Sequence, residues 1–192
     1  MPDSLSLEII QEVARGSTKA FRVVVEEYQA FAYAVAFRFV GNEDDAEDIV
    51  QETFVRLWKN LHLYKQEIKL TTWLYRIIAN LCLDFLKSRH GRQRKNKVDI
   101  DKVSFVHDHS TPEKEFQQRE LMQAIHQGAE ELTPKQRAVF ILRDLEGLTT
   151  EEVSEALTMS AGNVKSNLFY ARQKMVEKLK VFYQTTDKQF IQ

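Results

Sequence analysis

Residues 149–172 read TTEEVSEALTMSAGNVKSNLFYAR and contain the most specific pattern in the chain. The threonine pair at the start is a favoured helix N-cap, and the two glutamates after it complement the positive end of a helix dipole. We expect a short helix over residues 151–157 and a tight turn over residues 158–160. A second helix should begin at Ala161, with Ser160 as its cap.

These two expected helices meet the requirements of a helix-turn-helix. Ser154 supplies a small residue where the helices cross, and apolar residues can hold the pair together, namely Val153, Leu157, Met159, Val164 and Leu168. The outer face of the second helix would then lie in a DNA major groove. A plain helical hairpin with a solvated basic face is the alternative, because such patterns are short. The candidate DNA-binding residues are Ser160, Asn163, Lys165, Ser166, Asn167, Tyr170 and Arg172.

The composition of the chain favours helices and gives no indication of catalysis. Only six glycines and three prolines occur among 192 residues, which favours long helices over a turn-rich β architecture. We recognise no phosphate-binding glycine loop and no nucleophile paired with a base. We therefore expect a protein that is not an enzyme, with no cofactor, no metal and no small-molecule substrate.

Cysteine content and hydropathy bear on the cellular compartment. The single cysteine, Cys82, excludes an internal disulfide and a multi-cysteine zinc site. No apolar run approaches the roughly 18 residues that a membrane-spanning helix needs, and no signal-peptide core follows Met1. We expect a cytoplasmic protein.

Helical periodicity marks the N-terminal part of the chain. Apolar residues recur at steps of three and four through residues 21–39, 46–61 and 74–85, which predicts helices with one buried face each. The Gly41-Asn42 pair should separate the first two of these helices. Thr71 or Thr72 can cap a further helix that starts at Trp73.

The apolar pattern stops after residue 90 and resumes near residue 113, where Thr133 and Pro134 form a helix start of their own. We interpret the polar stretch between them as a flexible linker. The sequence thus predicts an all-α fold of two small four-helix domains with a C-terminal helix-turn-helix. The expected boundaries are 1–90 and 113–184 for the domains, 91–112 for the linker and 185–192 for a frayed tail.

Six acidic residues fall within residues 43–52, with no basic residue among them. Acids near a helix N-terminus stabilise it by about 0.3–1 kcal/mol each, but repulsion between acids four residues apart opposes so large a cluster. We expect a docking face for a basic or polar partner, and a solvated acidic face is the alternative. The residues predicted to lie on this face, off the apolar stripe, are Asp45, Asp48, Gln51, Glu52 and Arg56.

The helix expected from Trp73 leads directly into a basic run over residues 87–97 that contains no acid. Cations that follow a helix with a polar outer face are typical of a nucleic-acid surface. The alternative is a helix C-terminus complemented by cations and followed by a solvated linker. The candidate nucleic-acid-binding residues here are Thr71, Thr72, Arg76, Asn80, Asp84 and Lys87.

Several stretches resemble, in family order, the extracytoplasmic-function (ECF) sigma factors of the sigma-70 family. DAEDIVQETFVRLW (residues 45–58) resembles the helix with which these proteins bind core RNA polymerase. TWLYRIIANLCLD (72–84) resembles their −10 element helix. LTPKQR (132–137) and GNVKS (162–166) resemble their −35 domain. One departure is Thr158, which stands where the family usually has glycine in the helix-turn-helix turn.

The resemblance implies a transcription initiation factor that directs core RNA polymerase to promoters. The acidic helix would bind the polymerase, the segment 63–72 with the face of Asn80 and Asp84 would open and read the −10 element, and the recognition helix would read −35 DNA. The resemblance also implies an anti-sigma factor as a further partner. The alternative is a helix-turn-helix transcriptional regulator whose N-terminal helices form a sensor or dimerisation module.

Overall fold

A computed structural model of the chain describes residues 6–64, 69–88 and 124–180, and the helical backbone of residues 181–189. The described part is helical and contains no strand, as expected for an all-α fold. The predicted linker, 91–112, lies outside the described residues. The N-terminal helices are α1 (Leu7–Ala14), α2 (Thr18–Val40), α3 (Glu43–Asn60) with the 3-10 turn η1 (Leu61–Leu63), and α4 (Leu70–Lys87).

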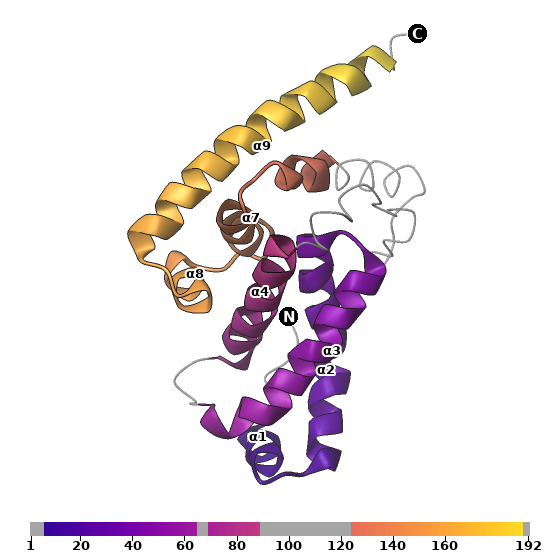
Figure 1. Ribbon diagram of the computed structural model, residues 1–192, viewed down its shortest axis with the longest axis vertical. Helices are drawn as coiled ribbons and strands as arrows, with labels where there is room; N and C mark the ends of the chain where they lie inside the picture. The colour runs from indigo at the N-terminus through magenta and orange to yellow at the C-terminus, as the bar shows by residue number, and fades with distance from the viewer. Residues whose placement is uncertain (1–5, 65–68, 89–123, 190–192) are drawn as a thin grey trace.

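The described C-terminal residues, 124–189, form a helix that includes residues 124–130 and three further helices. The longest helix, α9, runs along the outer edge of the molecule (Figure 1). It continues to Gln189 and so includes residues 185–189 of the stretch that we expected to form a frayed tail. The elements here are α7 (Pro134–Phe140) with the π-helical turn η3 (Ile141–Leu145), α8 (Thr150–Leu157) and α9 (Ala161–Gln189).

Most helix starts follow the capping signals of the sequence. Thr133 and Thr149 each form a capping box, in which the threonine side chain accepts from a backbone N–H and the residue three positions on accepts in return. Gly41 ends α2 in the left-handed conformation, and the Asn42 side chain caps α3. The expected cap at Thr71 or Thr72 is wrong: α4 begins earlier, at Leu70, because apolar burial of Leu70 extends the helix without a side-chain cap.

The two halves of the molecule share one continuous apolar core. Residues of α2, α3 and α4 belong to the same buried cluster as residues of α7, α8 and the start of α9. Helix α4 lies between the N-terminal helices on one side and α7 with α8 on the other (Figure 1). A smaller second cluster joins α9 to the helix over residues 124–130. The described regions therefore pack against each other directly, which the apolar stripes of the sequence did not indicate.

The turn between α8 and α9 contains the one non-glycine residue with positive φ among the described residues. Thr158 ends α8 with φ 52° and ψ 50°. A β-branched residue pays about 1–2 kcal/mol for this left-handed conformation, whereas glycine adopts it freely. The turn nonetheless closes as expected, because the Met159 N–H donates to the Ser154 carbonyl at 3.0 Å.

Replacing Thr158 with glycine is expected to stabilise the protein by about 1 kcal/mol, after allowing for the greater freedom of glycine in the unfolded chain. Urea unfolding followed by circular dichroism measures this change as a higher midpoint at unchanged slope. Thr150→Gly, within helix α8, is the control and should destabilise. Equal stability of Thr158→Gly and wild type would contradict the strain assigned to this turn.

Candidate functional site

Helix α3 exposes a polar strip opposite its buried stripe. Ala46, Ile49 and Leu57 are buried against α2 and α4, while Asp48 and Glu52 are exposed, as expected. Gln51 is exposed as well, and Arg56 is half-buried, with its Nε donating to the Glu52 carboxylate at 2.8 Å.

One residue predicted for this strip lies elsewhere. Asp45 is buried, with 3% of its surface exposed, so its expected position on the docking face is wrong. It occupies the first turn of α3, where its backbone N–H donates to the Asn42 side chain. The start of α3 packs into the core, where the neighbouring Ala46 is fully buried as well.

Sequence analysis missed an apolar residue in the middle of the polar strip. Val55 is 43% exposed and lies one turn beyond Gln51 and Glu52 on the same side of α3. An exposed aliphatic side chain ringed by charged residues is typical of a protein-binding surface. The sequence does contain a signal for this exposure: Val55 is apolar but does not fall on the three- and four-residue steps that define the buried stripe of this helix. We call Asp48, Gln51, Glu52 and Val55 the α3 face.

Helix α4 exposes a second polar strip. Arg76, Asn80, Asp84 and Lys87 are all exposed, as predicted, and the Lys87 ammonium lies 4.0 Å from the Asp84 carboxylate. Asn80 and Lys87 follow Trp73 at seven-residue steps, so the three side chains project in nearly the same direction.

The start of α4 differs from expectation. Thr72 is buried, with 5% exposed, and does not contribute to the polar strip, whereas Thr71 is half-buried. An aromatic pair lies at this end of α4. The ring centroids of Tyr64 and Trp73 are 5.4 Å apart, with an interplanar angle of 30°. Paired aromatic faces are suited to stacking on unpaired bases. We call Trp73, Arg76, Asn80 and Lys87 the α4 face.

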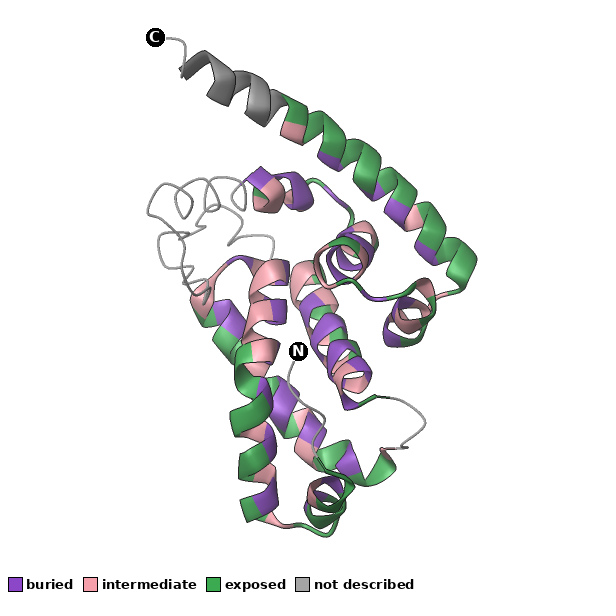
Figure 2. Cartoon of the chain, turned by 180° about the vertical axis from the view of Figure 1, so that it is seen from behind, coloured by how far each residue is buried: buried purple, intermediate pink, exposed green. Residues whose placement is uncertain are grey.

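The helix-turn-helix forms as the sequence predicted. Val153 and Val164 are fully buried between α8 and α9, and the Ser160 hydroxyl accepts from the Asn163 backbone N–H at 3.3 Å. The outer side of α9 is exposed over residues 161–180 (Figure 2). Of the predicted DNA-binding residues, Asn167 is half-buried and the exposed ones are Ser160, Asn163, Lys165, Ser166, Tyr170 and Arg172.

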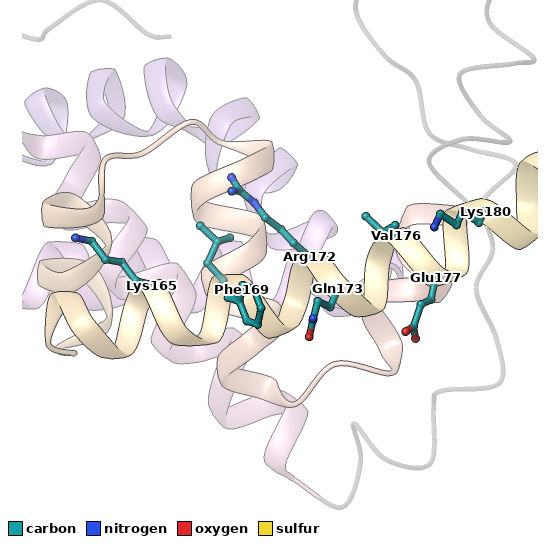
Figure 3. A pocket seen from close by; sticks show the side chains of 8 residues that line it. Lys165, Phe169, Arg172, Gln173, Val176, Glu177 and Lys180 are labelled. Atoms are coloured by element: carbon teal, nitrogen blue, oxygen red, sulfur yellow. The ribbon is translucent and has the colours of Figure 1, made fainter.

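A groove runs along the outer side of α9, with Lys165, Phe169, Arg172, Val176 and Lys180 in its lining (Figure 3). The side chains of Phe169 and Val176 are 58% and 50% exposed, so this side of the helix combines cations with apolar groups.

Not every cation of α9 remains available on this side. Both Nε and Nη2 of Arg172 donate to the Asp144 carboxylate, at 2.8 and 2.6 Å, and this hydrogen bonding raises the pKa of the guanidinium above its ordinary value. Lys174 donates to the Glu131 carbonyl, and Lys178 forms an ion pair with the Glu131 carboxylate. Arg172 therefore ties α9 to η3, and Lys165 is the exposed cation nearest the N-terminus of α9.

A polar cluster that sequence analysis did not single out joins the two halves of the molecule. The Glu146 carboxylate, which follows η3, accepts from Arg38 Nη1 of α2 at 2.5 Å and from the Tyr75 hydroxyl of α4 at 2.9 Å. Burial and the neighbouring Glu146 charge raise the pKa of Tyr75, so its hydroxyl remains a donor. These residues are 108 and 71 positions from Glu146 in the chain, so no local pattern could have connected them.

A second contact between the halves involves His126. Gly41 lies against this residue so closely that a Cβ at position 41 would overlap the His126 ring. The His126 Nε2 lies 3.4 Å from Nη2 of the buried Arg137. Burial, and then the Arg137 charge, lower the pKa of His126 to about 4. The histidine is therefore neutral at physiological pH when the halves are in contact.

Acid is expected to loosen this contact. A histidine whose pKa is lowered in the packed state favours packing above its free pKa and loses that preference as the pH falls through about 6.5. The packed-to-separated ratio should fall about tenfold between about pH 7.5 and pH 5.5. Arg137 is itself influenced by Glu130, on the same helix as His126, and by the thiol of Cys82 on α4. The distance between fluorophores on α1 and α8 measures the change.

His126→Gln is the control for this titration, because glutamine keeps an acceptor for Arg137 and does not titrate. It should remove most of the pH dependence. An equally steep pH response in His126→Gln would assign the effect to other groups.

Neither a metal-binding cluster nor a membrane-spanning helix is found among the described residues. Within them, no group of three His, Cys, Asp or Glu side chains is arranged to hold a metal ion. In the same part of the chain, no helix combines the length and the apolar character that crossing a membrane requires.

Comparisons with known proteins match both halves of the chain. Residues 24–92 match the family Sigma-70 region 2, and residues 122–175 match Sigma-70, region 4. The ECF RNA polymerase sigma-E factor of Salmonella typhimurium is 30% identical over 177 residues, which cover 89% of this chain and 92% of that protein. The RNA polymerase sigma-H factor of Pseudomonas aeruginosa is 29% identical over 172 residues, covering 86% and 89%.

Solved structures share the fold. CnrH, in complex with the cytosolic domain of CnrY, has a TM-score of 0.64 at 22% identity and covers 91% of this chain. The sigma factor RpoE of Bartonella quintana, in complex with the anti-sigma factor NepR, has a TM-score of 0.62 at 24% identity and covers 85% of this chain.

The alternative of a helix-turn-helix regulator with a sensor module fails, because the N-terminal helices match Sigma-70 region 2. The chain belongs to the extracytoplasmic-function (ECF) family of RNA polymerase sigma factors.

Proposed function

We propose that this sigma factor divides its work among three surfaces. The α3 face binds core RNA polymerase, the α4 face opens and reads the −10 element, and the outer side of α9 reads the −35 element. The observation that carries this assignment is that each of these surfaces is exposed while the opposite side of its helix is buried.

The chemistry of each surface suits its proposed role. Asp48 and Glu52 around Val55 offer charge and an apolar centre to a protein partner. Arg76, Asn80 and Lys87 offer donors to phosphates and base edges beside the Tyr64–Trp73 pair. On α9, Asn163, Lys165 and Ser166 are placed at the N-terminal end of the recognition helix, the end that enters the major groove in helix-turn-helix proteins.

The proposal places the protein in the cytoplasm, with core polymerase and promoter DNA as partners and no catalytic activity of its own. An anti-sigma factor is a further proposed partner, because the sigma factor RpoE of Bartonella quintana, whose fold is similar, was solved with the anti-sigma factor NepR bound.

Run-off transcription tests the function directly. Core polymerase is incubated with a library of randomised promoters, with and without the purified chain, and the transcripts are sequenced. We expect the chain to enrich a defined pair of elements upstream of the transcript starts. Identical transcripts with and without the chain would contradict the proposal.

A further inference from the structure

The outer side of α9 carries two large aromatic side chains next to each other. Phe169 and Tyr170 are 58% and 54% exposed, and their ring centroids lie 5.5 Å apart in an edge-to-face arrangement. Two exposed rings in contact mark a binding surface more specifically than single exposed apolar residues do. We call Phe169 and Tyr170 the aromatic patch.

The aromatic patch lies at the centre of the outward side of the helix. At about 100° per residue, the direction opposite the buried stripe of α9 is close to that of Ser166, and Phe169 and Tyr170 project about 50° to either side of it. All three residues belong to the first three turns of α9. In a helix-turn-helix this part of the second helix lies in the major groove. The residues of the buried stripe are Val164, Leu168, Ala171 and Met175.

No free cation occupies this centre. Residues 161–171 contain no arginine, and Arg172 is held by the Asp144 carboxylate through two of its nitrogens. Lys165 is exposed but projects about 90° away from the outward direction, toward the wall of a groove, where phosphates lie. The Asn167 amide donates to a backbone carbonyl one turn earlier. The groups that face the floor of the groove are therefore a small hydroxyl and two rings.

The edges that base pairs present in the major groove determine what such a patch can read. Arginine or lysine is the usual reader of guanine, whereas thymine presents a methyl group that apolar side chains such as phenylalanine contact. A ring against a guanine or cytosine edge would remove water from polar atoms and give no hydrogen bond in return. Asn163, exposed in the first turn of the same helix, is of a type that reads adenine, the partner of thymine.

We propose that the aromatic patch makes this sigma factor select A·T base pairs at adjacent positions of its −35 element, by packing Phe169 and Tyr170 against thymine methyl groups. Lys165 contributes affinity through phosphates and carries no sequence preference. The proposal rests on the function proposed above, in which the outer side of α9 reads the −35 element. It adds the class of sequence that this side reads.

Promoters selected from a randomised library by core polymerase with the full-length chain test the sequence class. We expect adjacent A·T pairs in the selected −35 element. The Tyr170→Arg variant replaces one ring with a guanidinium and should shift the preference at one of these positions toward G·C by about tenfold. A wild-type −35 element that consists of G·C pairs would overturn the proposal.

Removal of the thymine methyl groups alone is the sharper test. Deoxyuridine in place of thymidine keeps the hydrogen bonds of the base pair and removes one methyl group per position. Burial of one such group corresponds to about a fourfold change in affinity, so two replacements should weaken promoter binding by the holoenzyme about tenfold. Two replacements in the spacer between the elements are the matched control and should have no effect. Equal affinity for both forms of the −35 element would contradict methyl recognition.

The Phe169→Ala, Tyr170→Ala double variant connects methyl recognition to the patch. Both side chains are exposed, so the variant should fold, which circular dichroism checks. It should bind the thymidine and deoxyuridine promoters equally well, because the groups that contact the methyls are absent. Val176→Ala, which removes an exposed apolar group two turns further along α9, is the control and should keep the wild-type preference. A double variant that still prefers thymidine as strongly as wild type would assign methyl recognition to other residues and overturn the proposal.

The same measurements distinguish this inference from its neighbours. If the double variant loses affinity for core polymerase while its −35 preference stays that of wild type, the patch binds a protein rather than DNA, and the proposal is overturned. If the wild-type holoenzyme selects no −35 element at all, the function proposed above fails together with it. A selected −35 element that is insensitive to both deoxyuridine and the double variant would overturn methyl recognition alone.

Discussion

The Asp48→Lys, Glu52→Lys double variant should bind core RNA polymerase at least about a hundredfold more weakly than wild type. Both carboxylates are exposed on the α3 face, one turn apart and beside the exposed Val55. Removing a charged hydrogen-bond partner from an interface costs about 1.5–3 kcal/mol, and a like charge in its place adds repulsion. Two such changes correspond to at least a hundredfold. Fluorescence anisotropy with labelled protein and purified core polymerase measures the affinity.

The Glu8→Lys, Glu12→Lys variant is the matched control. These glutamates are also exposed and four residues apart, and they lie on α1 of the same half of the protein. The control makes the same change in net charge and should keep the wild-type affinity within about threefold. If both double variants lose binding equally, net charge rather than the α3 face governs the interaction. If neither loses it, the α3 face is not the polymerase-binding surface.

The parts of the fold that the sequence predicted well are those determined by local chemistry. The capping boxes at Thr133 and Thr149, the break at Gly41-Asn42 and the cap at Ser160 all depend on residues within four positions of each other. The helix-turn-helix belongs to the same class, because its apolar contacts are set by helical periodicity within one stretch of 24 residues. The exposed residues of the α3 and α4 faces follow from the same periodicity.

The wrong predictions concern residues whose burial depends on packing between segments that are far apart in the chain. Asp45 and Thr72 are polar and were expected on exposed faces, but both lie in the first turn or two of a helix whose start packs into the core. Tyr75 packs against Phe31 of α2 but also donates to Glu146, so its burial depends in part on an element far along the chain. That element comes from beyond residue 133, and a single helix pattern contains no information about such a partner.

The hydrogen bonds between Arg172 and Asp144 also join residues that are far apart in the chain, and here they involve a predicted DNA-binding residue. Its position in the recognition helix predicted a DNA contact, but Asp144 of η3 engages two of its nitrogens. The acid lies 28 positions away and belongs to the one π-helical turn of the described chain, a local irregularity that helical periodicity does not predict. Arg172 therefore positions α9, and Asn163, Lys165 and Ser166 remain the stronger candidates for DNA recognition.

The Asn80→Ala variant should use duplex promoters about tenfold less well than wild type while it binds core polymerase normally. The amide is exposed in line with Trp73 and Lys87 on the α4 face. Loss of a hydrogen bond to a base edge costs about 1–3 kcal/mol, which corresponds to a factor of about 5–150. The initial rate of run-off transcription on a linear duplex, at saturating protein, measures the effect.

A template with a pre-melted −10 region should recover most of the activity of Asn80→Ala, because the energy of unstacking and unpairing the bases no longer has to be supplied by contacts of the protein. Asn60→Ala is the control: this asparagine is also exposed, but its side chain donates to the Arg56 carbonyl at the end of α3. Wild-type rates for Asn80→Ala on duplex DNA would remove Asn80 from the promoter-opening surface. An equal defect on duplex and pre-melted templates would instead show that Asn80 binds DNA after opening and does not help to open it.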